Sequence, residues 1–439
     1  MARHLVLLVL LALTLGACDS GAGTATTMPT TTTSAAPTTT TVPASTTTTT
    51  PQPQATPPDL SGLEGISPEV REQLEALIVA AEDVRGLPFL TPPVITVVSD
   101  AELETRVRES IEEDIEDFPA DESLYKLLGL LDPEVDLLTL LLDLYGEQVA
   151  GFYDGDTGEI VVPSHEEGLS TLQRGTLVHE LVHALTDQHF EFDSKFDEMI
   201  DQERLDLATA YQALIEGDAT LAEVLWVQGL SQAELGEFVG ESLEADTSAL
   251  QSVPPFIQDS LLFPYDTGLN FVEDLYQADG WAAVNEAYTL MPDLPASTEQ
   301  VIEPDDYRRD LPLEVEIPQF ELEGYELERT SVWGEQGFRV MIDQVLGESL
   351  GGPAADGWGG DAYHQWFDGE NAALLIVYRG DTERDLEELE SALVAYEAAA
   401  VAEEDFGLVA VSEGHLYFVL ADEIAVGEQI SQTLGFSTG

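Results

Sequence analysis

The stretch HELVHALTDQH, residues 179–189, decides how this chain folds, because it places His179, Glu180 and His183 in one apolar helical segment. Residues four apart lie on one face of a helix, one turn from each other, so the two imidazoles point toward a common position. This geometry suits a zinc ion, with Glu180 beside it to accept a proton from water. Without such a partner the three polar side chains would be costly to bury. We therefore expect a metal site on this helix.

The segments around the motif predict a buried helix next to a hairpin. Ser170 and Gln173 form a capping box, and residues 172–185 are apolar on nearly every side, which is typical of a helix inside a protein. Before it, VAGFYDGDTGEIVVP, residues 149–163, has two apolar segments that flank the turn-rich DGDTG, which predicts a β-hairpin.

A catalytic zinc site needs a third protein ligand, and the sequence offers two candidates. His189 has the spacing of the metzincin pattern HExxHxxGxxH. However, six residues turn a helix by about 600°, so the helix would have to break, and Thr186 stands where that pattern has glycine. The other candidate is Glu216 in ALIEGDAT, in a predicted helix whose small alanine neighbours allow a close approach to the HExxH helix. We predict that Glu216 is the third ligand and that His189 is not.

The EGDA segment, residues 216–219, resembles the EGxA segment that supplies the glutamate ligand in gluzincin peptidases, the thermolysin-like and aminopeptidase-like group. The segment PYDTGLNFVEDL, residues 264–275, resembles the YxxG segment of gluzincin aminopeptidases, whose tyrosine stabilises the developing oxyanion, and this implies a catalytic role for Tyr265. The hairpin is similar to the zincin edge strand that pairs with an extended substrate. The interval between His183 and Glu216 is longer than in familiar gluzincins.

This resemblance implies an α+β, zincin-like fold, with a small mixed sheet, the active-site helix behind it, and a mostly helical lower half. Helical patterns cover residues 122–147, 196–229 and 265–276, whereas short strands alternate with helices from about residue 331. We expect a zincin-like domain over residues 59–330 and a C-terminal α+β region over residues 331–439. His364 and His415 receive no catalytic role, and ASTEQVIEPDDY (296–307) and GWGGDAYHQW (357–366) receive no role at all.

The N-terminus predicts export. Arg3 precedes an apolar run over residues 5–15, too short for a membrane span, and LGAC resembles a bacterial lipobox that ends at Cys18. The alternative is an ordinary signal peptide. Cys18 is the only cysteine, which excludes an intramolecular disulfide and a thiolate metal cluster. Residues 19–58 are rich in Thr and Pro and predict a disordered tether. We expect an extracytoplasmic lipoprotein, anchored to the bacterial plasma membrane through lipid alone.

The charge is strongly negative, with 15 Lys and Arg against 85 Asp and Glu and a formal net charge of -70. This charge repels nucleic acid and anionic lipid headgroups. It is compatible with life in salt or with a generally acidic secretome. The function that the motifs favour is a zinc-dependent peptidase acting on extracellular proteins or peptides. The alternative is a catalytically inactive zincin-like lipoprotein that acts as a binding or envelope-organising module.

Overall fold

The computed structural model describes residues 60, 66–113, 118–148, 151–163, 168–289 and 291–436. The predicted signal peptide (1–18), its lipidation site Cys18 and the predicted tether (19–58) lie outside these residues. Among the helices of the described ranges, none is both long and apolar enough to cross a membrane.

A small mixed sheet forms the N-terminal part, as the sequence predicts. The strand order is β1-β3-β2, with β1 parallel and β2 antiparallel to β3, so β2 is an edge strand. The elements are α1 (Pro68–Arg85), β1 (Val94–Val98), α2 (Asp100–Glu113), α3 (Phe118–Leu127), α4 (Leu137–Gln148), β2 (Phe152–Asp154) and β3 (Glu159–Pro163). The prediction of one helix over 122–147 is wrong, because Gly129 adopts a φ of 69° and Pro133 follows, and together they separate α3 from α4.

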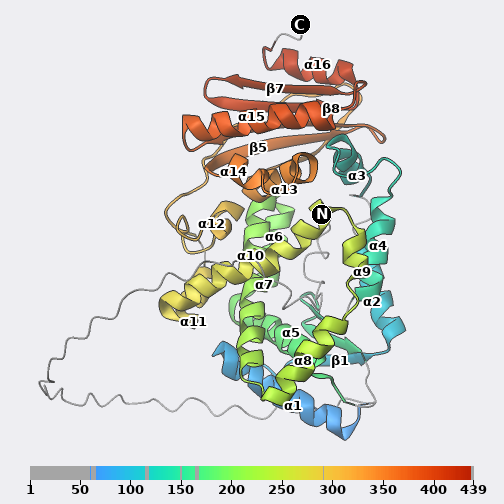
Figure 1. Cartoon of the computed structure of the whole chain (residues 1–439), viewed down its shortest axis with the longest axis vertical. Helices are drawn as coiled ribbons and strands as arrows, with labels where there is room; N and C mark the ends of the chain where they lie inside the picture. Colours follow the sequence, from blue (N-terminus) through green and yellow to red (C-terminus); the bar gives the residue numbers. More distant parts are fainter. Residues whose placement is uncertain are drawn as a thin grey trace, which may run out of the picture.

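A helical body follows the sheet (Figure 1). Its elements are α5 (Thr171–Phe190), α6 (Phe192–Asp201), α7 (Leu205–Gln228), α8 (Gln232–Glu244), α9 (Ser248–Ser252), α10 (Pro255–Asp279), α11 (Trp281–Ala287) and α12 (Thr298–Ile302). The predicted helical region over 196–229 consists of two helices, because the chain turns between α6 and α7, where Glu203 has a φ of 55°. The predicted helix over 265–276 is the second half of the longer α10, which contains Pro264.

A second sheet lies at the opposite end of the molecule from α1 (Figure 1). It is antiparallel, with the order β4-β5-β6-β8-β7. The elements are β4 (Glu326–Ser331), α13 (Gly334–Leu346), α14 (Gly351–Ala355), β5 (Trp358–Phe367), β6 (Ala372–Gly380), α15 (Glu383–Ala400), β7 (Phe406–Ser412), β8 (His415–Ala421) and α16 (Ile424–Thr433). The α+β class is confirmed.

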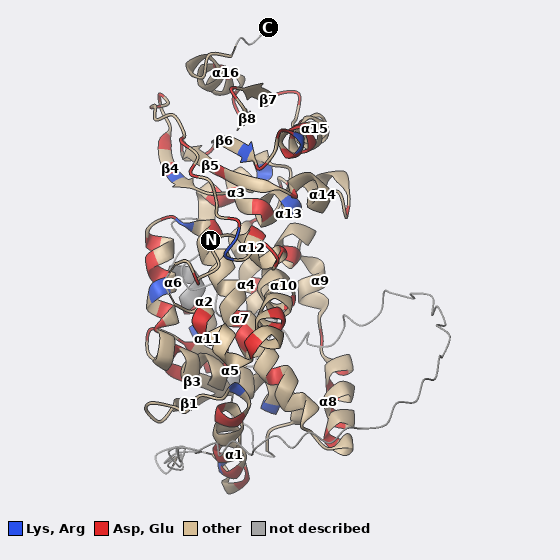
Figure 2. Cartoon of the chain, turned by 90° about the vertical axis from the view of Figure 1, so that its left-hand side faces the viewer, with Lys and Arg blue, Asp and Glu red and all other residues tan. Residues whose placement is uncertain are grey.

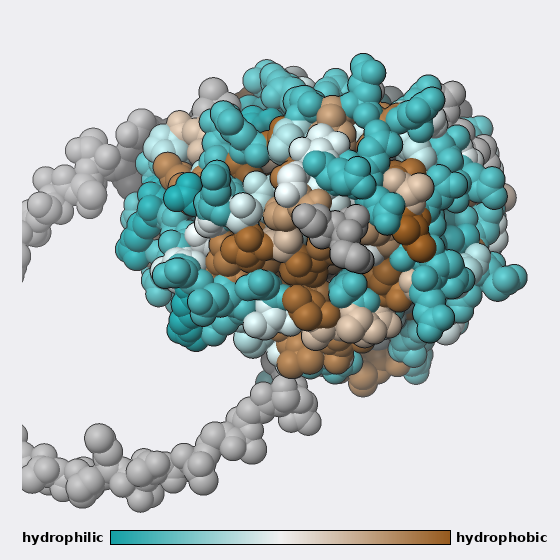
Figure 3. Space-filling view, turned by 90° about the horizontal axis from the view of Figure 1, so that it is seen from above, coloured by the Kyte–Doolittle hydropathy of each residue, from teal (hydrophilic) through white to brown (hydrophobic). Residues whose placement is uncertain are grey.

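Acidic residues and exposed apolar residues are distributed differently over the molecule. Asp and Glu positions are spread along helices throughout the molecule, and Lys and Arg positions are sparse (Figure 2). Seen from the end that carries the second sheet, the surface includes an apolar area bordered by hydrophilic residues (Figure 3). Val394, Val411 and Ile424 are among the exposed apolar residues of this C-terminal region. The long helices α5 and α7 are by contrast buried over most of their length, so polar residues within them are shielded from water.

Candidate metal centre

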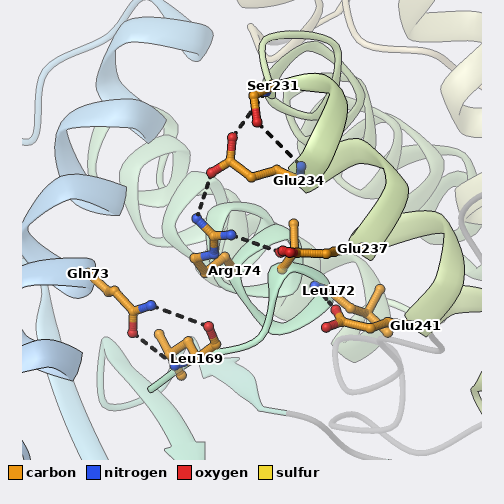
Figure 4. Close-up of polar contacts among 9 residues, drawn as sticks. Gln73, Leu169, Leu172, Arg174, Ser231, Glu234, Glu237 and Glu241 are labelled. Carbon is orange, nitrogen blue, oxygen red and sulfur yellow. Dashed lines mark hydrogen bonds and ion pairs between the residues drawn. The ribbon is translucent and has the colours of Figure 1, made fainter. Parts of the chain in front are cut away.

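The start of α5 is fixed by side chains from its own sequence and from α8. The predicted capping box is present, with the Ser170 hydroxyl and the Gln173 side chain each accepting a backbone N–H. The backbone N–H of Leu172 donates to Glu241 of α8 at 2.7 Å (Figure 4). A carboxylate at the first turn of a helix also complements the helix dipole. These contacts fix the axial position of the HExxH segment.

Two more contacts connect α5 to its surroundings (Figure 4). Arg174 contacts Glu234 of α8 at 3.4 Å, and Glu234 also belongs to the capping box of that helix. On the other side, the Gln73 amide of α1 accepts the Leu169 N–H at 2.8 Å and donates to the Leu169 carbonyl at 3.3 Å. The segment that enters α5 is therefore held between α1 and α8.

Helices α7 and α10 cross in backbone contact, and glycine permits this at both sides of the crossing. A Cβ atom on Gly268 would lie 2.2 Å from the Ala213 carbonyl oxygen, and one on Gly217 would lie 2.2 Å from the Gly268 carbonyl oxygen. Gly217 follows Glu216, and Gly268 comes one helical turn after Tyr265. The glycines of the EGDA and YDTG segments thus bring the carboxylate of one helix close to the phenol of the other.

The structure brings His179, His183 and Glu216 together. Glu216 Oε2 lies 3.1 Å from His179 Nε2 and 3.2 Å from His183 Nε2, and all three residues are at least 98% buried. Ligand atoms of a tetrahedral zinc site lie about 3.3–3.5 Å apart when the bonds are about 2.0–2.1 Å long. Both distances from Glu216 Oε2 are therefore close to the spacing of metal ligands, the three ligand atoms lie within 4.8 Å of one another, and the group could hold a metal ion.

The charges of the cluster also fit a cation. Burial opposes a charge on His179, but a hydrogen bond with Glu216 and the nearby carboxylate of Glu223 raise its pKa to about 10. Burial likewise opposes a charge on Glu216, but the charge of His183 and hydrogen bonds with both histidines lower its pKa to about 2. Glu216 Oε1 is buried and has no hydrogen-bond partner among the residues that the structure describes. The negative charge of Glu216 thus favours a cation between the carboxylate and the ring nitrogens, whereas burial lowers the pKa of His183 and favours its neutral form.

Glu180 lies beside this group and is held by the edge strand. The backbone N–H of Tyr153 in β2 donates to Glu180 Oε2 at 2.7 Å. Burial raises the pKa of Glu180 to about 8, and the charge of Glu216 acts in the same direction. The similarity to the zincin edge strand implied that β2 pairs with an extended substrate. Because Glu180 accepts this N–H, the N–H is not available for such pairing. The strand positions the carboxylate instead.

Glu223 is a site residue that the sequence analysis missed. Its Oε2 atom lies 3.6 Å from His179 Nδ1, on the side of the ring opposite to Glu216, and the residue is 2% exposed. Its other oxygen would contact a Cβ atom at Gly175, so the absence of a side chain there makes room for the carboxylate. Carboxylates in this position orient ligand histidines and fix their tautomer. Glu223 lies seven residues after Glu216, on the same helical face, and this spacing was an available signal.

Tyr265 lies next to the cluster, within α10. Its ring centroid is 6.1 Å from that of His179, with the planes 28° apart. Burial raises the pKa of its phenol far above 10, and the charges of Glu216 and Glu180 raise it further. The phenol therefore keeps its proton at neutral pH.

His189, His364 and His415 lie outside this cluster. Helix α5 continues past His183 to Phe190, and His189 Nε2 is 2.7 Å from the Pro88 carbonyl oxygen. His364 in β5 contacts the Thr330 hydroxyl at 2.7 Å, and His415 begins β8. A second group of side chains that could hold a metal ion consists of Asp156, Asp193 and Asp197. It is partly exposed.

Comparisons with known proteins give two matches. Residues 323–428 match a family model described as a domain of unknown function, DUF8575. A chain from Chloroflexus aurantiacus, described as a proposed hydrolase with a novel fold, is 17% identical and has a TM-score of 0.37. That similarity covers 55% of this chain and 91% of the other and is too low to support an argument about function. No curated protein matches the chain. Neither match names a metallopeptidase family.

Proposed function

We propose that this protein is a zinc-dependent peptidase of gluzincin type that hydrolyses extracellular peptide bonds. The observation that carries the proposal is the buried group of His179, His183 and Glu216, whose ligand atoms all lie within 4.8 Å of one another, with the carboxylate of Glu180 beside them. Two imidazoles and one carboxylate are the ligand set of catalytic zinc in peptidases.

The roles of the residues follow from their positions. Zinc supplies a Lewis acid and lowers the pKa of water bound to it to about 7. Glu180, held by the Tyr153 N–H, accepts the proton of the attacking water and passes it to the leaving amine. Tyr265 donates a hydrogen bond to the carbonyl oxygen as negative charge develops there. Glu223 holds the His179 ring in the orientation that directs Nε2 toward the metal.

The test begins with the purified protein. It should contain one zinc per chain by elemental analysis and hydrolyse casein in a chelator-sensitive way. Metal without turnover on casein or on a peptide library would favour a binding or envelope-organising module instead.

Variants separate the individual roles. Glu180→Gln should retain zinc and lose turnover, because only the proton acceptor is removed, whereas Glu216→Ala should lose zinc because two imidazoles alone hold it weakly. His189→Ala is the control and should change neither quantity. Loss of zinc in His189→Ala, with zinc retained in Glu216→Ala, would assign the third ligand to His189 and refute the proposal.

We also propose that the protein is anchored outside the bacterial plasma membrane through a lipid on Cys18, because the LGAC segment precedes a Thr-rich stretch. The anchor would hold the peptidase near extracellular substrates. Metabolic labelling with a fatty-acid probe should mark the wild type, and labelling that persists in Cys18→Ala would disprove the anchor.

A further inference from the structure

Strand β7 forms one edge of the second sheet, and this edge carries no charged residue. The order β4-β5-β6-β8-β7 gives β7 a neighbouring strand on one side only. Its sequence FGLVAVS, residues 406–412, contains no Lys, Arg, Asp, Glu or Pro. It pairs with β8 residue by residue, in one continuous register. An apolar edge of this kind is a template for pairing with a further strand.

The other edge of the same sheet is protected against such pairing. Strand β4 contains a register shift between Leu327 and Arg329, and three of its six residues are charged. The Thr330 N–H is also occupied, because it donates to the Glu203 carboxylate at 3.0 Å. Proteins commonly block a sheet edge with a bulge, with charged side chains or by covering its backbone groups. Within the part of the chain that the structure describes, β7 has none of these features.

Every second residue of β7 directs its backbone N–H and C=O away from β8. The two-residue turn Glu413–Gly414, with φ of 52° and 78°, closes the hairpin, so Ser412 and His415 form a hydrogen-bonded pair. Such pairs alternate along an antiparallel ladder, and the outward-facing residues are therefore Gly407, Val409 and Val411. Their outward backbone groups have no hydrogen-bond partner among the described residues.

Helices hold β7 on both of its faces. A Cβ atom on Gly427 of α16 would lie 2.1 Å from the Phe406 ring, so the ring packs directly against that helix. On the other face, a Cβ atom on Gly407 would lie 2.7 Å from the Glu397 side chain of α15. The strand and α16 lie at the end of the molecule opposite to α1 (Figure 1). The edge is thus preformed, which lowers the entropic cost of binding a partner.

The surroundings of this edge are acidic. The acidic segment EED, residues 403–405, precedes β7, and the exposed Glu413 follows it. Arg384 is the last basic residue of the chain, and it is paired with Glu388 at 2.8 Å. A partner with an uncharged middle and positively charged ends therefore complements the edge.

A second copy of the chain fits the edge less well. Two β7 strands paired antiparallel about Val409 would place Asp405 of each copy opposite Glu413 of the other, because each residue lies four positions from the centre. Like charges directly opposite each other destabilise a strand pair. Each copy also carries a formal net charge of -70. A basic peptide meets no such repulsion.

We propose that the outer edge of β7 binds an extended peptide segment, uncharged in the middle and with Lys or Arg at both ends, as a sixth strand of the second sheet. Gly407, Val409 and Val411 exchange main-chain hydrogen bonds with it, which gives affinity with little demand on the sequence of its middle. The acidic residues at both ends of β7 select its charge. This site depends on neither the metal centre nor the peptidase function.

The first experiment is isothermal titration calorimetry on the full chain after chelation. The probe is the peptide KKTVTVTKK with an acetylated N-terminus and an amidated C-terminus, and it should bind saturably. One control peptide carries N-methyl groups on its five middle residues, so it keeps the charge but loses those N–H donors. The other control has glutamate in place of lysine. Both should bind at least tenfold more weakly, and equal binding of either control, or no binding of the probe, would overturn the proposal.

Variants locate the binding. Val411→Lys places a positive charge on the outer edge and should weaken probe binding at least tenfold. Leu327→Lys is the matched control on β4 and should leave binding unchanged, because the two residues are similarly exposed, at 41% and 45%. Val409→Pro removes one outward N–H without a loss of pairing to β8 and should also weaken binding. Wild-type affinity in a folded Val411→Lys or Val409→Pro would overturn the proposal. If circular dichroism shows both to be unfolded, the N-methylated peptide decides.

Sedimentation velocity of the chain alone distinguishes the peptide from a second copy. Wild type and Val411→Lys should sediment alike. A wild-type dimer that dissociates in Val411→Lys would overturn the proposal and assign the edge to contact between two copies. Higher salt should weaken binding of the basic probe, because salt screens the attraction between its ends and the acidic residues. Binding that does not change with salt would overturn the assigned charge of the partner.

Discussion

Gly268→Ala tests whether backbone contact between α7 and α10 builds the metal centre. Helix propensity alone predicts a more stable protein, by about 1 kcal/mol, because alanine is the better helix former. The structure predicts the opposite sign. The new Cβ atom would lie 2.2 Å from the Ala213 carbonyl oxygen, where an ordinary contact needs at least 3.4 Å, so the helices must separate by about 1.2 Å. Overpacking of this kind costs about 1–3 kcal/mol.

The consequence for the site is specific. Zinc content should persist, because the ligands come from α5 and α7, but Tyr265 moves with α10. Turnover should fall about tenfold to a hundredfold, as expected for a misplacement near 1 Å. Gly217→Ala should reduce zinc affinity as well, because it pushes on the backbone next to Glu216.

The assay is urea unfolding at constant pH, with zinc content measured on the same samples. Gly240→Ala is the matched control, because this glycine lies in α8 with open space around its Cα atom, and helix propensity should stabilise that variant. A Gly268→Ala protein as stable as Gly240→Ala, with wild-type turnover, would refute the account of the crossing.

Three further variants test buried and capping side chains other than the three predicted metal ligands. Burial raises the pKa of Glu335 to about 8 from an unfolded value near 4.5, so wild-type stability should fall as pH rises through that window. Glu335→Gln should remove this loss, about 4 kcal/mol at pH 8, and equal pH profiles in urea unfolding would contradict it. Asp218→Asn breaks the buried pair with Arg85 and should lower the free energy of unfolding by about 3–5 kcal/mol. A decrease below about 1 kcal/mol would show that the pair is hydrated. Ser170→Ala should cost about 1 kcal/mol by loss of the cap on α5, and an unchanged urea midpoint would argue against that cap.

Short-range sequence patterns predicted the parts of the site that depend on contacts within one helix. The capping box at Ser170 and the apolar run after it specify α5 within one segment, and the four-residue spacing of His179 and His183 then sets the direction of both rings. Glu216 was predicted from a short resemblance. Its position next to the histidines depends on how α7 packs against α5, together with the close crossing at Gly217, and no spacing along the chain encodes either.

The helix breaks that the sequence analysis missed have a similar origin. Glu203 adopts a left-handed conformation that a glutamate does not prefer, so its residue type gives no warning that α6 and α7 are separate helices. Tertiary contacts hold the turn, because the Glu203 carboxylate accepts the Thr330 N–H at 3.0 Å and its carbonyl accepts the Ser331 hydroxyl. Both partners belong to β4, more than a hundred residues away.

The cavity between the helical body and the C-terminal sheet region shows why a cavity is harder to predict than a set of candidate metal ligands. A zinc ligand set reuses a few residue types at fixed spacing, so it leaves a pattern in the sequence. The wall of a cavity is apolar like any core. It differs from a core only because the side chains on its opposite sides do not touch. Tyr145 and Trp333 look like ordinary core residues in the sequence, and only the assembled structure shows that both line a cavity. Contacts between segments that are distant in the sequence therefore determine the wall of this cavity, and Trp333 belongs to the part that the C-terminal region supplies.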